Sequence, residues 1–181
     1  MSGAIPILAR AGFPRRKILY RSGLRATIAP MIRSIMYYSS AVRAMSAEEL
    51  AALEQECELN AIHVGITGML LHKHGEFLQV LEGPKGVVGD MYARILVDPR
   101  HTVAGKISDR PIARREFEGA TLRFRNLDTA PAGTPFLTPF SYEAFRANPD
   151  LALLVLKYFF CNQGDEPAPA ESWSSATPSL V

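Results

Sequence analysis

The chain has 181 residues, of which 48% are hydrophobic and 21% are charged, as is usual for one globular domain with appendages. The net charge is only +2, but residues 1–33 carry seven Arg or Lys residues and no acid, so the rest sums to 2 − 7 = −5. A mildly acidic body argues against a nucleic-acid groove. Cys57 and Cys161 lie in no metal-ligand spacing, which argues against a zinc site or a disulfide framework and favours a reducing cytoplasm.

The sequence contains no segment typical of a membrane span. Its longest apolar run, 151–161, is too short and includes Lys157. The basic residues 1–33 favour a disordered extension, or an upstream start codon ahead of Met31. A targeting peptide is the alternative, although no clear apolar segment accompanies the arginines.

The residue pattern from position 34 predicts alternating strands and helices. Strands are expected at 34–39, 65–71, 76–82, 103–108 and, as a short fifth, 122–124. A turn at 72–75 joins the second and third strands into a hairpin. Between the first two strands, a capping box formed by Ser46 and Glu49 opens a helix. A second helix follows Gly83-Pro84 and ends at Asp98-Pro99.

This β-α-β-β-α-β order predicts an α+β, ferredoxin-like sheet with two helices on one face. Two C-terminal helices are expected at 142–146 and 149–161. The second is capped by Asn148 and is apolar almost all round, so it should dock on the domain or on a second subunit. The predicted organisation is a basic extension (1–33), a domain (34–125), a linker with C-terminal helices (126–163) and a disordered tail (164–181).

Gln79 is the most informative residue because it lies in a strand that is apolar on both faces. An unpaired buried amide costs about 1–3 kcal/mol, so the fold must supply partners. A carboxamide both donates and accepts, and can therefore bridge a phenol and a heteroaromatic edge. Tyr37, on the first strand, is a candidate phenol. A core Gln bonded to local backbone and a core Tyr are the alternatives.

Other polar residues follow the second predicted helix. Arg94 and Asp98 are spaced i, i+4 and form either a surface ion pair or a pair that holds the imide edge of a ring ligand. Arg100 and His101 either contact a phosphate or ribose, or are solvated turn residues. His72 and His74 lack a third ligand with suitable spacing, which favours exposed turn histidines over a metal site.

Several segments together resemble the BLUF domains, the sensors of blue light using flavin. The similar segments span roughly 34–125 and are 35–39, 65–71, 77–84, 92–95, 98–101 and 111–117. The resemblance implies FAD, with the isoalloxazine ring between the two helices beside the sheet. Tyr37 resembles the electron and proton donor, and Gln79 the amide that changes hydrogen-bond partners. The implied cofactor-binding residues are Tyr37, Ser39, Asn60, Ile66, Gln79, Arg94, Asp98, Arg100 and His101.

The chain departs from the family pattern at three positions. Ala61 stands where the family usually has Asn, and Asn60 precedes it, so either a local bulge brings Asn60 into that place or one flavin hydrogen bond is missing. Ala120 and Leu122 replace a Trp and a Met in a segment associated with signal output.

The leading hypothesis is a stand-alone blue-light photoreceptor that is not an enzyme. It would signal to a protein partner, or act as a homo-oligomer through the C-terminal helix, and would bind neither nucleic acid nor membrane. One alternative is a light-insensitive interaction module that has lost flavin. A second is an acylphosphatase-like hydrolase that uses Asn60 and an arginine.

Overall fold

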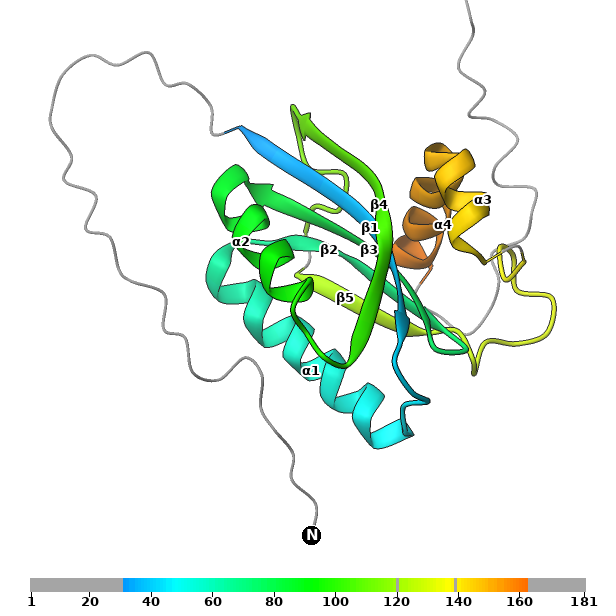
Figure 1. Ribbon diagram of the computed structural model, residues 1–181. Helices are drawn as coiled ribbons and strands as arrows, with labels where there is room; N and C mark the ends of the chain where they lie inside the picture. Colours follow the sequence, from blue (N-terminus) through cyan, green and yellow to red (C-terminus); the bar gives the residue numbers. More distant parts are fainter. Residues whose placement is uncertain (1–30, 120, 139, 163–181) are drawn as a thin grey trace, which may run out of the picture.

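The computed structural model describes residues 31–119, 121–138 and 140–162, in which five strands form one mixed sheet (Figure 1). The order across the sheet is β4-β1-β3-β2-β5, and all neighbours are antiparallel except β5, which runs parallel to β2. The strands are β1 (Ile32–Ala41), β2 (Thr67–Lys73), β3 (Glu76–Pro84), β4 (His101–Ile112) and β5 (Leu122–Asn126). β3 therefore lies in the middle, between β1 and β2.

Helices cover both faces of this sheet. The helices α1 (Ala47–Val64) and α2 (Lys85–Ile95) lie on one face, and α3 (Tyr142–Ala147) and α4 (Pro149–Cys161) lie on the other (Figure 1). The predicted α+β, ferredoxin-like fold is confirmed, with a fifth strand added to the sheet edge.

Local sequence signals explain where the helices begin. At α1 the Ser46 hydroxyl accepts the Glu49 N–H at 3.3 Å and the Glu49 carboxylate accepts the Ser46 N–H at 2.9 Å, which completes the capping box. Gly65 ends α1 with a φ of 68°. At α4 the side chain of Asn148 accepts the Leu151 N–H, as its sequence predicted.

Several predicted boundaries are wrong by a few residues. β1 and β4 extend beyond 34–39 and 103–108 because they pair with each other along ten residues of β1. The hairpin turn is only His74 and Gly75, with φ values of 49° and 82°, since both central residues of such a tight turn need positive φ. α2 ends at Ile95, three residues before Asp98.

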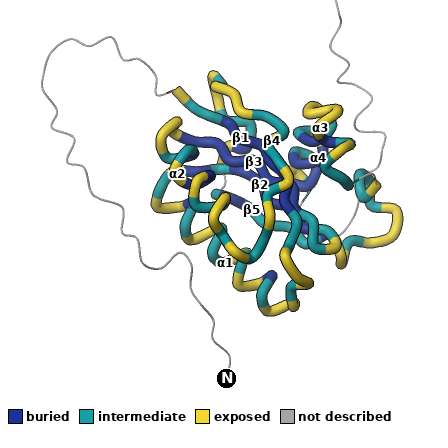
Figure 2. The backbone as a smooth tube through the Cα atoms, viewed as in Figure 1, coloured by how far each residue is buried: buried dark blue, intermediate teal, exposed yellow. Residues whose placement is uncertain are grey.

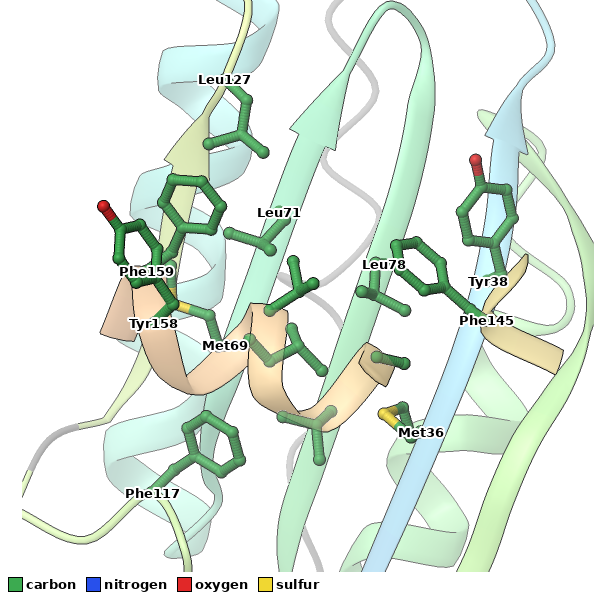
Figure 3. Close-up of a cluster of buried hydrophobic side chains, with 14 residues drawn as sticks. Met36, Tyr38, Met69, Leu71, Leu78, Phe117, Leu127, Phe145, Tyr158 and Phe159 are labelled. Carbon is green, nitrogen blue, oxygen red and sulfur yellow. The ribbon is translucent and has the colours of Figure 1, made fainter. Parts of the chain in front are cut away.

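The alternation of side chains along the strands produces two separate apolar layers. Ile35 and Tyr37 point towards α1 and α2, whereas Met36 and Tyr38 point towards α3 and α4. Figure 2 shows the buried strands at the centre, between partly exposed helices. Figure 3 shows the second layer, in which aliphatic and aromatic side chains of the sheet meet α4. The sheet is thus buried on both sides.

The C-terminal helix α4 docks on the sheet of its own chain, the first of its two predicted positions. Its buried residues are Ala152, Val155, Leu156, Tyr158 and Phe159. Within the part of the chain that the structure describes, every helix is too short or too polar to span a bilayer. The predictions for the two tails lie almost wholly outside the described residues.

Leu156→Ala should lower the free energy of unfolding by about 2–5 kcal/mol, because Leu156 is fully buried between α4 and the sheet. Leu154→Ala on the same helix is the matched control. Its side chain is 38% exposed, so the loss should be less than half as large. Chemical denaturation measures both values, and equal losses would contradict the docking of α4.

Candidate functional site

A cavity lies between α1, α2 and the face of the sheet that these helices cover. Strand residues form its floor and helix residues its walls, and the segment after α2 closes one end. Its lining residues are Tyr37, Ser39, Met45, Leu53, Glu56, Cys57, Asn60, Leu70, Phe77, Gln79, Leu81, Met91, Ile95, Asp98, Arg100, His101 and Leu122. The cavity therefore collects residues from β1, α1, β2, β3, α2 and the start of β4 and β5.

Tyr37 and Gln79 face each other on the cavity floor. They are directly opposed across the β1–β3 pair, and each is only 3% exposed. The Tyr37 hydroxyl donates a hydrogen bond to Oε1 of Gln79. The buried amide thus has the phenol as a partner, as the sequence predicted. β4 has register shifts opposite Met36/Tyr37 and Tyr38/Ser39, and such bulges often adjust side chains beside functional sites.

The surroundings of Tyr37 keep its phenol neutral. Burial raises the pKa of Tyr37 well above its usual value, and the nearby Cys57, Tyr92 and Asp98 raise it further. The Tyr92 ring contacts the Tyr37 ring edge-on, with 5.3 Å between the ring centroids. The phenol therefore holds its proton and acts as a donor in the ground state.

The walls of the cavity are mostly apolar. Leu53 on α1, Met91 and Ile95 on α2 and Leu70 on β2 provide aliphatic or thioether surface. Cys57 adds a thiol, and burial raises its pKa to about 12, so this thiol is protonated near neutral pH. These walls suit the two faces of a flat aromatic ligand.

Three charged residues form one end of the cavity. Arg100 bonds both carboxylate oxygens of Asp98, with the closest contact at 2.7 Å, and reaches Glu56 at 3.1 Å. Burial alone would raise the pKa of Asp98, but the hydrogen bonds from Arg100 outweigh burial and lower it. The same bonds raise the pKa of Arg100. One guanidinium therefore faces two carboxylates.

Two polar groups of the lining are suited to a ligand. Nδ1 of His101 is buried and has no hydrogen-bond partner within the described part of the chain. Burial lowers the pKa of His101, which keeps its imidazole neutral. Asn60 uses its amide nitrogen to bond the Glu56 carbonyl one helical turn earlier, at 2.6 Å.

The cavity contains seven of the nine residues predicted to bind a cofactor, namely Tyr37, Ser39, Asn60, Gln79, Asp98, Arg100 and His101. Ile66 lies in the neighbouring apolar layer, and Arg94 is not part of the lining. The prediction that Arg94 and Asp98 both lie on the second helix is wrong, because α2 ends at Ile95, before Asp98. The Asp98 carboxylate pairs with Arg100.

The structure shows where Asn60 and Ala61, at which the chain departs from the family pattern, lie relative to the cavity. α1 is continuous from Ala47 to Val64, so Asn60 reaches the cavity without the bulge that was one of the two alternatives. Ala61 is 1% exposed and packs in the apolar layer beside the cavity. Asn60 is therefore the amide that α1 offers to the cavity.

Some functional features were not predicted. Glu56 and Met45 line the cavity, and the only signal for this was their place in the capped helix and directly before its cap. The prediction of two exposed turn histidines is half wrong: His74 is exposed, but His72 is 3% exposed, and its ring accepts the Gly75 N–H. No cluster of three or more metal-ligating residues occurs among residues 31–119, 121–138 and 140–162.

A flavin ring fits this set of residues. Apolar walls flank a floor that carries a neutral phenol and an amide, and the buried Nδ1 of His101 still needs a partner. An isoalloxazine has the two features that match: flat apolar faces and a polar edge that accepts and donates hydrogen bonds.

The chain is similar to known light-responsive proteins. It is 38% identical over 86 residues, or 48% of its length, to the photoactivated adenylate cyclase subunit beta of Euglena gracilis, of which this match covers 10%. The structure of a bacterial light-regulated adenylyl cyclase matches 77% of this chain. The match covers 42% of the cyclase chain, at 26% identity and a TM-score of 0.56. The BlrP1 BLUF structure also matches 77% of this chain. The match covers 96% of the BlrP1 BLUF chain, at 25% identity and a TM-score of 0.53.

The chain thus spans about a tenth of the length of the curated relatives it matches. The sequence profile described as "Sensors of blue-light using FAD" matches residues 32–123, which include the whole cavity. The chain belongs to the BLUF family.

Proposed function

We propose that this chain is a blue-light photoreceptor that binds FAD in the cavity between α1 and α2 and signals to a protein partner. The observation that carries the proposal is the buried hydrogen bond from Tyr37 to Gln79 on the cavity floor. A sheet that needed only a packed core would place apolar residues at both positions, because buried polar pairs gain little stability over apolar ones.

When bound, the flavin would supply a group that absorbs blue light and, once excited, can take one electron from a nearby donor. The protein's part is to hold a neutral phenol and an amide where they can respond. With Oε1 of Gln79 accepting from Tyr37, the amide nitrogen has two donors to offer to a ring edge. Transfer of an electron from Tyr37 would make its hydroxyl a stronger acid, so that its proton would pass along the hydrogen bond towards Gln79, and electron and proton would later return to Tyr37. Gln79 would then change its hydrogen-bond partners, and the altered network would be the signal.

The other cavity residues have supporting roles in this proposal. Asn60 and Ser39 contribute hydrogen bonds to the ring edge, and Asp98 with Arg100 closes the end of the cavity. His101 offers its buried Nδ1 to the ligand. We assign the cofactor as FAD because that is the flavin the family description names. Mass spectrometry of the extracted cofactor distinguishes FAD from a shorter flavin.

The signal would pass to a separate protein in the cytoplasm rather than to a catalytic site in the described domain. The α3–α4 layer is the side available for such a partner or for a second copy, since α1 and α2 enclose the cavity. The hydrolase hypothesis has less support, because Asp98 and Glu56 already pair with Arg100, which lines the cavity together with Asn60.

Tyr37→Phe should abolish a reversible red shift of the bound flavin spectrum under blue light. The variant keeps the ring but removes the hydroxyl that bonds Gln79. Tyr38→Phe is the matched control, since Tyr38 is equally buried on the same strand but faces α3 and α4, and it should keep the shift. Difference absorption spectra measure both. A shift that persists in Tyr37→Phe would identify another donor, and a protein that stays colourless with FAD would favour the light-insensitive module.

Asn60→Ala should weaken flavin binding about fivefold to a hundredfold, which is the usual effect of losing one hydrogen bond of about 1–3 kcal/mol to a ligand. Ala61→Asn should not strengthen binding. Its amide would enter the apolar layer where Ala61 is 1% exposed, and should lower the melting temperature. Fluorescence titration and thermal unfolding test the pair. Tighter binding by Ala61→Asn would show that position 61 faces the flavin.

A further inference from the structure

The fully buried carboxyl of Glu82 has no role in the cavity. Glu82 lies on β3 and is 0% exposed. Its Oε2 accepts the backbone N–H groups of Glu116 at 2.7 Å and Phe117 at 3.1 Å, while Oε1 has no partner among the residues described. A buried carboxyl that leaves one oxygen unpaired is costly, so packing alone does not account for a glutamate here.

The segment that Glu82 holds is tied to the same end of the sheet a second time. Arg115 donates to the Glu82 carbonyl at 2.7 Å and to the Thr67 hydroxyl at 2.9 Å, and its other terminal nitrogen donates to the Gly65 carbonyl at 2.6 Å. Residues 115–117 are therefore fastened to β3 by both the side chain and the backbone of Glu82. This segment connects β4 to β5.

Residues 115–117 also contact α4. The Glu116 carboxylate pairs with Lys157 of α4 and with Arg110. The Phe117 ring is fully buried among the side chains beneath α4 (Figure 3) and meets the Phe160 ring edge-on, with 5.1 Å between centroids. Movement of residues 115–117 would therefore change how α4 packs against the sheet.

Gln79 lies on the same strand as Glu82 and links this strand to the cavity. Gln79 and Glu82 are three residues apart on β3, so their side chains point to opposite faces of the sheet. Gln79 lines the cavity and Glu82 holds the segment that meets α4. Among the described strands, β3 lies between β1, which carries Tyr37, and β2, which carries Thr67.

We propose that Glu82 is a positioning residue that couples β3 to α4, so that a change of hydrogen bonding at Gln79 alters the packing of α4 through residues 115–117. This inference rests on the proposed function. It assigns the α3–α4 face as the surface whose exposure to a partner depends on light. Glu82 itself touches neither the cavity nor the outer surface.

The test compares Glu82→Ala with the matched control Glu76→Ala in the full flavin-loaded chain. Glu76 lies at the other end of β3 and bonds Ser40 rather than residues 115–117. Hydrogen–deuterium exchange in the dark should be about tenfold faster at residues 115–117 and in α4 for Glu82→Ala only, because the buried N–H groups lose their acceptor. Glu82→Gln, with weaker neutral hydrogen bonds, should show a smaller change and replaces Glu82→Ala if that variant does not fold.

Blue light supplies the deciding measurement. The unaltered chain and Glu76→Ala should show a light-dependent change in the exchange of α4, and the Glu82 variants should keep the flavin red shift but lose this change. An α4 response of full size in the Glu82 variants, or none in an unaltered chain that does show the red shift, would overturn the coupling alone. An unaltered chain without a red shift would overturn both the coupling and the proposed function.

Discussion

The pairing of Tyr37 with Gln79 across β1 and β3 is the constraint on which the rest of the structure depends. Both groups are buried, and a buried amide is tolerated only when its hydrogen-bonding groups find partners. The antiparallel register places the two residues directly opposite each other, so the sheet itself sets their separation. A site of this kind is held by rigid strands rather than by loops, which favours a reproducible response.

The three-layer arrangement assigns different tasks to the two faces of the sheet. The α1–α2 face encloses a cavity with one phenol and one amide on its floor, and the α3–α4 face is packed with apolar side chains. Because successive residues of a strand alternate between faces, one strand contributes side chains to both faces of the sheet. Along β3, Gln79 belongs to the first face and Glu82 to the second. The sheet therefore separates the cavity from the α3–α4 layer.

Local signals in the sequence predicted the parts of the fold that depend on near neighbours. The capping box at Ser46 and the Asn148 cap of α4 are examples, and the Gln in an apolar strand pointed to its phenol partner. Long-range pairing set what the sequence could not show. β4 extends well past its predicted ends because β1 supplies hydrogen bonds along its length. Asp98 was predicted to lie on the second helix, but α2 ends at Ile95 and Asp98 lies in the following segment, where it pairs with Arg100.

The register shifts in β4 have a consequence beyond the site. Among the described residues β4 is an outer strand of the sheet, and an edge strand of this kind can pair with strands from other molecules. Irregular spacing bends such an edge, and the charged side chains of Lys106, Asp109 and Arg110 discourage close stacking. The irregularities beside Tyr37 and these charges thus disfavour pairing of this edge with strands of other molecules.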